Sequence, residues 1–366
     1  MYIYQKNNWP NFYWEIEKIS EILVSVRHKQ GRLIGRMEGM GFHLQSEATL
    51  STITLDVLKS SEIEGEILDK EQVRSSIAQK LGLDIGGLVP ADRNVEGIVE
   101  MMLDATQNYS RKLSIERLFD WHAALFPTGR SGMKKIIVAA WRTHGKDDPM
   151  RVISGPMGRE RVHFQAPDAD KVEHEMKSFI RWFNETVELD PVLKAAIIHL
   201  QFVTIHPFDD GNGRIARALT DMQLARADQS VQRFYSMSSQ IRKERKEYYT
   251  ILEKTQKGDL DITNWIIWFL RCLDRAIDNS EENLSLVLSK WKFWDRHSSA
   301  ILNERQRKMI NKLFSDFEGK LTSSKWAKMN KCSQDTAGRD INDLMDKGIL
   351  LKEAGGGRST SYTLHV

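Results

Sequence analysis

The residues of this 366-residue chain that could do chemistry concentrate in one stretch, His206 to Arg217, which reads HPFDDGNGRIAR. It places a histidine, two aspartates and two arginines around a Gly-Asn-Gly turn. Glycines adopt backbone angles that other residues resist, so the turn can present several free N–H groups to one anion. A helical pattern begins at Arg214, and the positive end of that helix dipole adds to the attraction. The stretch therefore predicts a phosphate-binding site.

The charged side chains of the same stretch suit the transfer of a phosphorylated group. Arg214 and Arg217 lie three residues apart on one helix face, where their guanidinium groups can bind a polyphosphate in bidentate fashion. One carboxylate beside such a turn suits Mg²⁺, which takes one or two protein carboxylates plus phosphate oxygens. His206 ends the preceding helical pattern and can act as a general base near neutral pH. These residues together predict phosphoryl or nucleotidyl transfer.

The stretch also resembles the signature of the Fic family, His-x-Phe-x-(Asp/Glu)-Gly-Asn-Gly-Arg-x-x-Arg, with every fixed position present. A Gly-Asn-Gly turn alone favours an ordinary loop between helices, whereas the full signature does not. The resemblance implies a largely helical enzyme that transfers AMP from ATP to a hydroxyl side chain (Ser, Thr or Tyr) of a target protein, itself included. The catalytic residues that it implies are His206, Asp210, Asn212, Arg214 and Arg217.

The resemblance implies separate roles for the histidine and for the acidic part of the loop. His206 would deprotonate the target hydroxyl, and Asp210 would hold Mg²⁺. Phe208 would anchor the loop in the core, whereas Asp209 occupies a variable position to which no role is assigned.

The remaining signature residues are implied to bind the phosphates of ATP. The backbone of Gly211 and Gly213, together with Asn212, would cradle the α- and β-phosphates with help from Arg214. Arg217 would pair with the γ-phosphate.

Two further segments resemble the family outside the signature. The sequence RERVHFQAP matches a hairpin flap on which a target protein docks as an added strand, here residues 161–167. Tyr249 and Gln256, seven residues apart on one helix face, would line the adenine and ribose pocket, although the family often has Asn at the second position. An ordinary edge hairpin and a buried pair of tyrosines are the alternatives. The flap residues implied to border the nucleotide are Val162, His163, Phe164 and Gln165.

Upstream, the sequence SSEIEG resembles the family's inhibitory helix pattern, (Ser/Thr)-x-x-x-Glu-(Gly/Asn), with Ser60, Glu64 and Gly65 in place. If this helix end docks on the nucleotide site, we expect the Glu64 carboxylate to pair with Arg217 in bidentate geometry and to displace the γ-phosphate. As a local string it is equally well a polar helix end with Gly65 as its C-cap.

Hydrophobic periodicity predicts that most of the chain is helical. Apolar residues recur at three- and four-residue intervals over residues 12–38 and 44–66, which predicts amphipathic helices. A break that contains Gly and Pro, residues 83–94, separates them from the rest. Over residues 134–167, β-branched residues alternate with Gly/Pro turns, which predicts one or two short hairpins. Helical patterns return over residues 170–185, 190–205, 214–227, 242–256 and 262–280.

The last eighty residues have a different pattern. Residues 323–350 predict a helix, a turn and a helix, and residues 351–366 predict a hairpin with a Gly-rich tip, an order that resembles a winged helix. We therefore expect a mainly α fold with a Fic-type helical core and a short hairpin flap. The expected domains are an N-terminal helical domain with the inhibitory motif (1–88), the catalytic core (89–285) and a winged-helix-like domain (286–366).

Composition indicates a cytoplasmic protein without a membrane segment. Lysine and arginine (53) nearly balance aspartate and glutamate (50), so no overall charge favours a particular partner. Only two cysteines are present, far apart, which fits a reducing compartment. The first residues lack the apolar stretch of a signal peptide, and the most apolar segment is short and interrupted by Arg271.

Two alternative functions remain open on the sequence. The same site could remove AMP from a modified protein, with Glu64 positioning a water molecule. A DNA-binding regulator could instead use the C-terminal domain, although its acidic residues weaken any basic surface. The family resemblance also leaves a homodimer open. The basic residues of this C-terminal domain include Lys325, Lys328, Lys331, Arg339 and Arg358.

Overall fold

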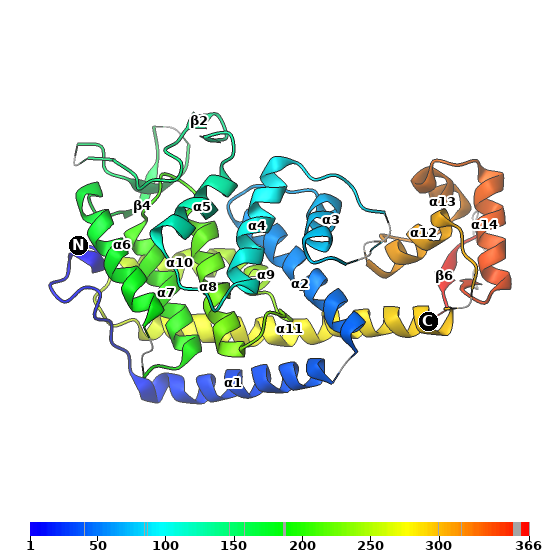
Figure 1. Cartoon of the computed structure of the whole chain (residues 1–366), viewed down its shortest axis with the longest axis horizontal. Coiled ribbons are helices and arrows are strands. Elements are labelled where there is room, and N and C mark those ends of the chain that lie inside the picture. The colour runs from blue at the N-terminus through cyan, green and yellow to red at the C-terminus, as the bar shows by residue number, and fades with distance from the viewer. Residues whose placement is uncertain are drawn as a thin grey trace. The chain divides into compact units, whose positions relative to one another are not determined.

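The structure, a computed structural model, describes residues 1–39, 41–83, 85, 87–145, 147–156, 158–185, 188–298, 300–315, 317–353 and 360–365. The chain divides into two compact units, residues 1–281 and 282–366, which are described separately below (Figure 1). Both units are mainly helical, which confirms the predicted fold class.

Amphipathic helices open the first unit, in agreement with the periodicity of the sequence. A single 3₁₀ turn, η1 (Ile3–Gln5), precedes α1 (Ile16–Glu38), whose buried side chains recur at helical spacing. α2 (Phe42–Ile63) ends where Gly65 adopts a φ of +88°, a left-handed conformation that glycine takes without steric cost. α3 (Lys70–Lys80), which the pattern did not single out, begins at an Asp69 cap.

Two adjacent helices, α7 (Pro191–Ile205) and α8 (Asn212–Asp228), form the centre of the first unit (Figure 1). Residues 192–205 are all buried, so α7 is covered on every side and needs no polar face. The surrounding helices are α4 (Arg93–Gln107), α5 (Ile115–Leu125), α6 (Ala169–Asn184), α9 (Met237–Lys243), α10 (Arg245–Gln256) and α11 (Thr263–Arg296), whose residues from Glu282 onward belong to the second unit.

The predicted hairpins are present, although they are shorter than the pattern indicated. β1 (Arg130–Ser131) pairs with β2 (Lys134–Lys135), and β3 (Arg151–Ser154) pairs with β4 (Arg161–Gln165), both antiparallel. Residues 136–142 include β-branched side chains but form no strand; the N–H groups of Ile137 and Arg142 donate to the loop between α7 and α8 instead.

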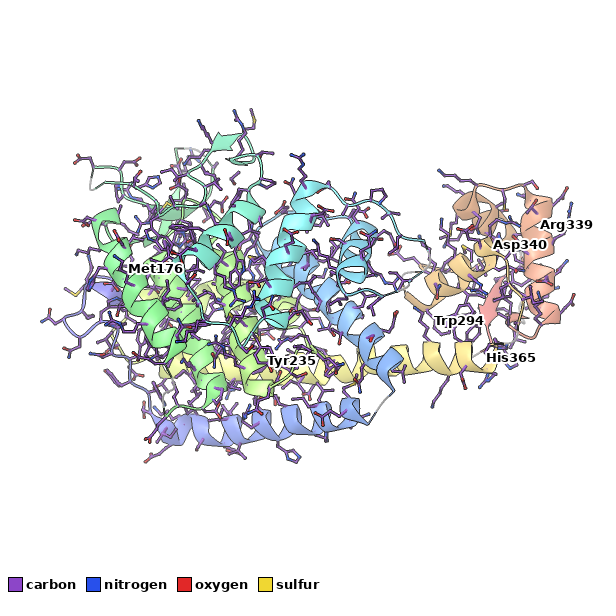
Figure 2. All side chains as sticks on the ribbon, viewed as in Figure 1. Met176, Tyr235, Trp294, Arg339, Asp340 and His365 are labelled. Carbon is purple, nitrogen blue, oxygen red and sulfur yellow. The ribbon has the colours of Figure 1, made fainter. Side chains whose placement is uncertain are left out.

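Two helices and a hairpin lie in the second unit in the order that the sequence predicted, and a further short helix that the pattern did not single out precedes them. The buried core of this unit includes Trp326, Ile341 and Leu344, and the side chain of Arg305 donates two hydrogen bonds to the buried carboxylate of Asp340 (labelled in Figure 2). The elements are α12 (Glu304–Ser315), α13 (Ser323–Asn330), α14 (Gln334–Asp346), β5 (Leu350–Lys352) and β6 (Tyr362–Leu364).

Several expectations about this unit and about the whole chain stay predictions. They are the winged-helix assignment, DNA binding, the homodimer, the cytoplasmic location and the domain boundary at residue 88. Arg339, on α14, is exposed, whereas Arg358 lies outside the described residues. No helix in the described ranges combines the length and the apolarity that crossing a bilayer requires.

Close packing between α4 and α5 makes one glycine indispensable. A Cβ atom on Gly97 would lie 1.8 Å from the carbonyl oxygen of Ala124, so one of the two helices would have to move. We expect Gly97→Ala to lower the free energy of unfolding by roughly 1–3 kcal/mol or more, as overpacked cores do. The exposed helical Gly35 has no atom within 4 Å of such a Cβ, so Gly35→Ala should instead raise it by about 0.5–1 kcal/mol. Chemical denaturation of both variants measures their free energies of unfolding, and equal values for the two would contradict this prediction.

Candidate functional site

The loop between α7 and α8 is a tight turn that side-chain hydrogen bonds close. His206 ends α7 in the left-handed region (φ +53°, ψ +58°), and Gly211 precedes α8 with a φ of +81°. The side chain of Asn212 binds Phe208 in both directions: its Oδ1 accepts from the Phe208 N–H at 3.0 Å, and its Nδ2 donates to the Phe208 carbonyl at 2.8 Å. An anion at this turn would therefore meet the first N–H groups of α8, which have no partner within the helix, rather than the Asn212 side chain.

His206 is held with one ring nitrogen available. Its Nδ1 lies 3.2 Å from the carbonyl oxygen of Val203, and because a carbonyl only accepts, Nδ1 carries the proton. The lone pair of Nε2 is then the basic site. Burial lowers the pKa of His206 to about 4, below the near-neutral value expected for a general base, so the free base predominates at pH 7.

The two aspartates of the loop bind different neighbours. Asp210 accepts from its own neighbour Gly211 N–H at 2.6 Å through Oδ1 and from the Ser131 hydroxyl through Oδ2. Asp209, to which the sequence assigned no role, accepts from the Ile137 N–H at 2.9 Å. Both are therefore positioned by the segment that follows α5.

The position of the Asp210 carboxylate suits Mg²⁺ better than a metal that needs several protein ligands. The carboxylate offers hard oxygen donors, remains half-buried, and lies beside the N-terminal end of α8. Within the described residues no group of three or more His, Cys, Asp or Glu side chains could hold a metal ion by itself. Such a sparse donor set is typical of Mg²⁺ that is shared with phosphate oxygens.

Arg217 is buried and binds the end of α2. Its Nε donates to the Ser60 hydroxyl at 2.9 Å, and its Nη2 donates both to the Ser60 carbonyl at 2.9 Å and to Glu64 Oε1 at 2.7 Å. The expected pair with Glu64 is present, but the expected bidentate geometry is wrong, because Ser60 occupies the other donors of that guanidinium edge. A Cβ atom on Gly213 would lie 2.1 Å from Glu64 Oε1, so the carboxylate sits directly over the first turn of α8.

Arg214 is paired with a second glutamate that the motif did not include. Its Nη1 lies 2.8 Å from Glu66 Oε2, and its guanidinium lies over the Phe126 ring at 4.9 Å. The only sequence signal for this residue was a second acid two positions after Glu64. The turn after α2 thus supplies one carboxylate to each arginine of the signature.

The flap residues of β4 lie against different surroundings. Phe164 is buried and meets the Tyr2 and Tyr4 rings edge-on. His163 Nδ1 lies 2.6 Å from Glu253 on α10, while Val162 is exposed and Gln165 half-buried. The side chain of Phe164 is therefore covered, and only its backbone could contact a ligand.

The two residues expected in an adenine pocket both lie on α10. Gln256 is buried, and its Nε2 lies 3.2 Å from Thr204 Oγ1, close to the end of α7 and hence to His206. Tyr249 is half-buried, with the Arg245 guanidinium 5.1 Å from its ring centre. Their role in binding adenine stays a prediction.

Two families match separate parts of the chain. The Fic/DOC family matches residues 112–224, and a family described as a domain of unknown function, DUF4172, matches residues 2–83. "Protein adenylyltransferase Fic" of Drosophila mojavensis is 26% identical over 221 residues, 59% of this chain. "Protein adenylyltransferase fic-1" of Caenorhabditis elegans is 28% identical over 228 residues, 60% of this chain.

The chain spans only part of these relatives, namely 39% of the fly protein and 40% of the worm protein. A solved structure of a Fic family protein from Desulfovibrio desulfuricans covers 96% of this chain and 97% of its own, with a TM-score of 0.53 at 20% identity. A Fic-domain protein from Bacteroides thetaiotaomicron covers 72% of this chain with a TM-score of 0.52 at 20% identity. These two likenesses concern the fold.

Three histidines around the site should make the protein less stable in acid. Burial lowers the pKa of His122 and His206 to about 4 and that of His199 to about 3. An unfolded histidine takes up a proton near pH 6.5, so stability is full above that pH and is lost as the pH falls toward 4. We expect each histidine to cost on the order of 1–2 kcal/mol of unfolding free energy between pH 7 and pH 5. Urea denaturation at the two pH values measures this loss of unfolding free energy. Replacing the fully buried His199 with Gln should make the loss smaller. A loss of the same size in the His199→Gln variant would contradict its origin in buried histidines.

Proposed function

Because this chain belongs to the Fic/DOC family, we propose that it is a protein adenylyltransferase that its own α2 segment inhibits. In the proposed reaction, AMP moves from ATP to a hydroxyl side chain of a target protein, or of the protein itself. The observation that carries the proposal is that both signature arginines, suited to a polyphosphate, are paired with glutamates from one turn, Glu64 and Glu66.

The catalytic step follows from the geometry of the loop. With Nδ1 protonated, His206 accepts the hydroxyl proton of the target at Nε2 as the hydroxyl oxygen attacks the α-phosphorus. The first N–H groups of α8 stabilise the charge on the phosphate oxygens, and pyrophosphate leaves. Mg²⁺, if bound, would be held by Asp210 and would neutralise phosphate charge.

Inhibition in this proposal is a competition between anions. The carboxylate of Glu64 lies over the first turn of α8 and binds Arg217, so it occupies the position where the γ-phosphate would pair. ATP that binds beside it has its phosphates displaced, and a displacement of about 1 Å can slow transfer on the order of a hundredfold.

Removal of AMP from a modified protein is the second candidate, and the position of Glu64 favours it. The Glu64 carboxylate lies beside Gly213, in the first turn of the helix that follows the His206 loop. A carboxylate there could orient a water molecule for attack on the phosphorus. Neither reaction identifies the target.

The first test separates the inhibitory role of Glu64 from a structural one. We expect Glu64→Gly to raise self-modification with labelled ATP ten- to a hundredfold, because Arg217 becomes free for the γ-phosphate. Arg217→Ala should lower transfer even in that background. Glu62→Gln is the matched control, since Glu62 lies on the same helix end but pairs with Lys59 and Arg242. Unchanged transfer by a folded Glu64→Gly protein would remove Glu64 from the inhibitory role.

The ion pair between Glu66 and Arg214 predicts a second, smaller effect on ATP binding. Glu66→Gln leaves Arg214 without its carboxylate, so in the Glu64→Gly background we expect ATP to bind about threefold to tenfold more tightly. Isothermal titration with a non-hydrolysable ATP analogue measures this. Equal affinities of the single and the double variant would mean that Glu66 does not compete with phosphate.

A third test isolates the chemical step. Because phosphate contacts come from α8 and its arginines, we expect His206→Ala to bind ATP nearly as well as its parent. Transfer should fall by about a hundred- to ten-thousandfold, the usual cost of losing a positioned base. Measured in the Glu64→Gly background, near-normal transfer would exclude His206 as the base.

A further inference from the structure

The segment 136–142 has no regular structure, yet several of its groups bind the loop between α7 and α8. The Ile137 N–H donates to Asp209 at 2.9 Å, the Arg142 N–H donates to the Pro207 carbonyl at 2.9 Å, and Arg142 Nε donates to the His206 carbonyl at 2.7 Å. We call residues 136–142 the strap, since they lie between the two hairpins and hold the loop at three points.

His122, on α5, provides a fourth connection between the strap and the loop. Its Nδ1 lies 3.2 Å from the Ala139 backbone nitrogen, and its Nε2 lies 3.1 Å from the Asp210 carbonyl oxygen. An N–H group only donates and a carbonyl only accepts, so Nδ1 must be bare and Nε2 must carry the proton. A neutral imidazole in one tautomer is the only form that satisfies both partners.

Packing fixes the plane of this imidazole. The ring is fully buried and stacks on Phe208 of the loop, with centroids 4.2 Å apart and an angle of 9° between the rings. The Phe126 ring lies 5.1 Å away.

Ala139 shows that the strap is held in this path. Its φ is +55°, in the left-handed region that a residue with a Cβ rarely adopts, and the conformation turns its N–H toward His122. A backbone conformation of this kind persists only where its surroundings hold it. The bond to His122 is one such contact.

We propose that His122 is a positioning residue for group transfer, because its neutral imidazole joins the Asp210 backbone to the strap and so sets the place of the Asp210 carboxylate. The proposal rests on the proposed function. The two ring nitrogens of His122 bind the Asp210 carbonyl and the Ala139 N–H, so His122 acts through Asp210.

The alternative is a histidine that contributes only to core stability. Removing either hydrogen bond would leave a buried polar group unpaired, which lowers stability in both cases. The two interpretations differ in what happens to the folded protein, since only a positioning residue changes how the Asp210 carboxylate holds a divalent cation.

Two polar variants of similar size separate the interpretations. In His122→Gln the amide can donate to the Asp210 carbonyl and accept from the Ala139 N–H, whereas the shorter side chain of His122→Asn can serve only the Ala139 side. Trp121→Phe is the control on the same helix, because it removes a buried hydrogen bond to Asp104 away from the loop.

The measurements are Mn²⁺ binding with a non-hydrolysable ATP analogue, followed by electron paramagnetic resonance, and kcat and KM for self-modification, all in full-length Glu64→Gly protein. We expect His122→Asn to weaken Mn²⁺ binding and to lower kcat about tenfold or more, the usual cost of losing a residue that orients a metal ligand. The KM for ATP should change less than threefold, and His122→Gln should restore most of both properties.

The proposal is overturned if a folded His122→Asn protein binds Mn²⁺ and turns over like its parent, or if His122→Gln or Trp121→Phe is impaired as much as His122→Asn. If His122→Asn does not fold, the proposal is also overturned when His122→Gln folds but binds Mn²⁺ weakly. If the Glu64→Gly parent transfers no AMP, the proposed function fails instead, while the Mn²⁺ measurement still tests His122.

Discussion

The need to neutralise one buried cation, the guanidinium of Arg217, organises this structure. Only 2% of its side chain is exposed, and a buried charge without a partner costs several kcal/mol. Here Ser60 and Glu64 meet that need, and they come from a helix more than 150 residues away in the sequence. An arginine at this place therefore requires an anion at all times. In the proposed function, the end of α2 and a phosphate compete to supply that anion.

A second buried network keeps α2 in register with α8. One helical turn below Ser60, the Asp56 carboxylate accepts from Ser236, and one turn beyond Arg217, Asp221 binds Arg233 at 2.9 Å. Burial and the neighbouring Asp221 charge raise the pKa of Asp56, so it keeps its proton more readily than an exposed aspartate. Tyr235, labelled in Figure 2, stacks with Arg233 at the end of this network. The Glu64 carboxylate thus approaches α8 from a helix that this network holds about two turns earlier, at Asp56.

The site was predictable from the sequence as far as its chemistry is local. Turn glycines and the residues from His206 to Arg217 act within one loop and one helix turn, so their spacing already indicates where they lie. Glu66, Asp209 and His122 act across elements that packing alone brings together, and no periodicity indicates such partners. The strap shows the same limit, since its β-branched residues predict a strand while its N–H groups bind the loop.

The exposure of the ion pairs decides whether such inhibition can be reversed. Arg217 and Arg214 are buried, whereas the side chains of Glu64 and Glu66 are 32% and 37% exposed. Water therefore screens the carboxylates, and they can return to solvent at a small desolvation cost, while the arginines remain in place for another anion. Gly65, with its positive φ, lies between the two glutamates, so the turn that carries them lies beyond the last helical residue of α2. A fully buried pair would hold more firmly and would not yield to a phosphate, so in the proposed inhibition the asymmetry between the partners would make the competition reversible.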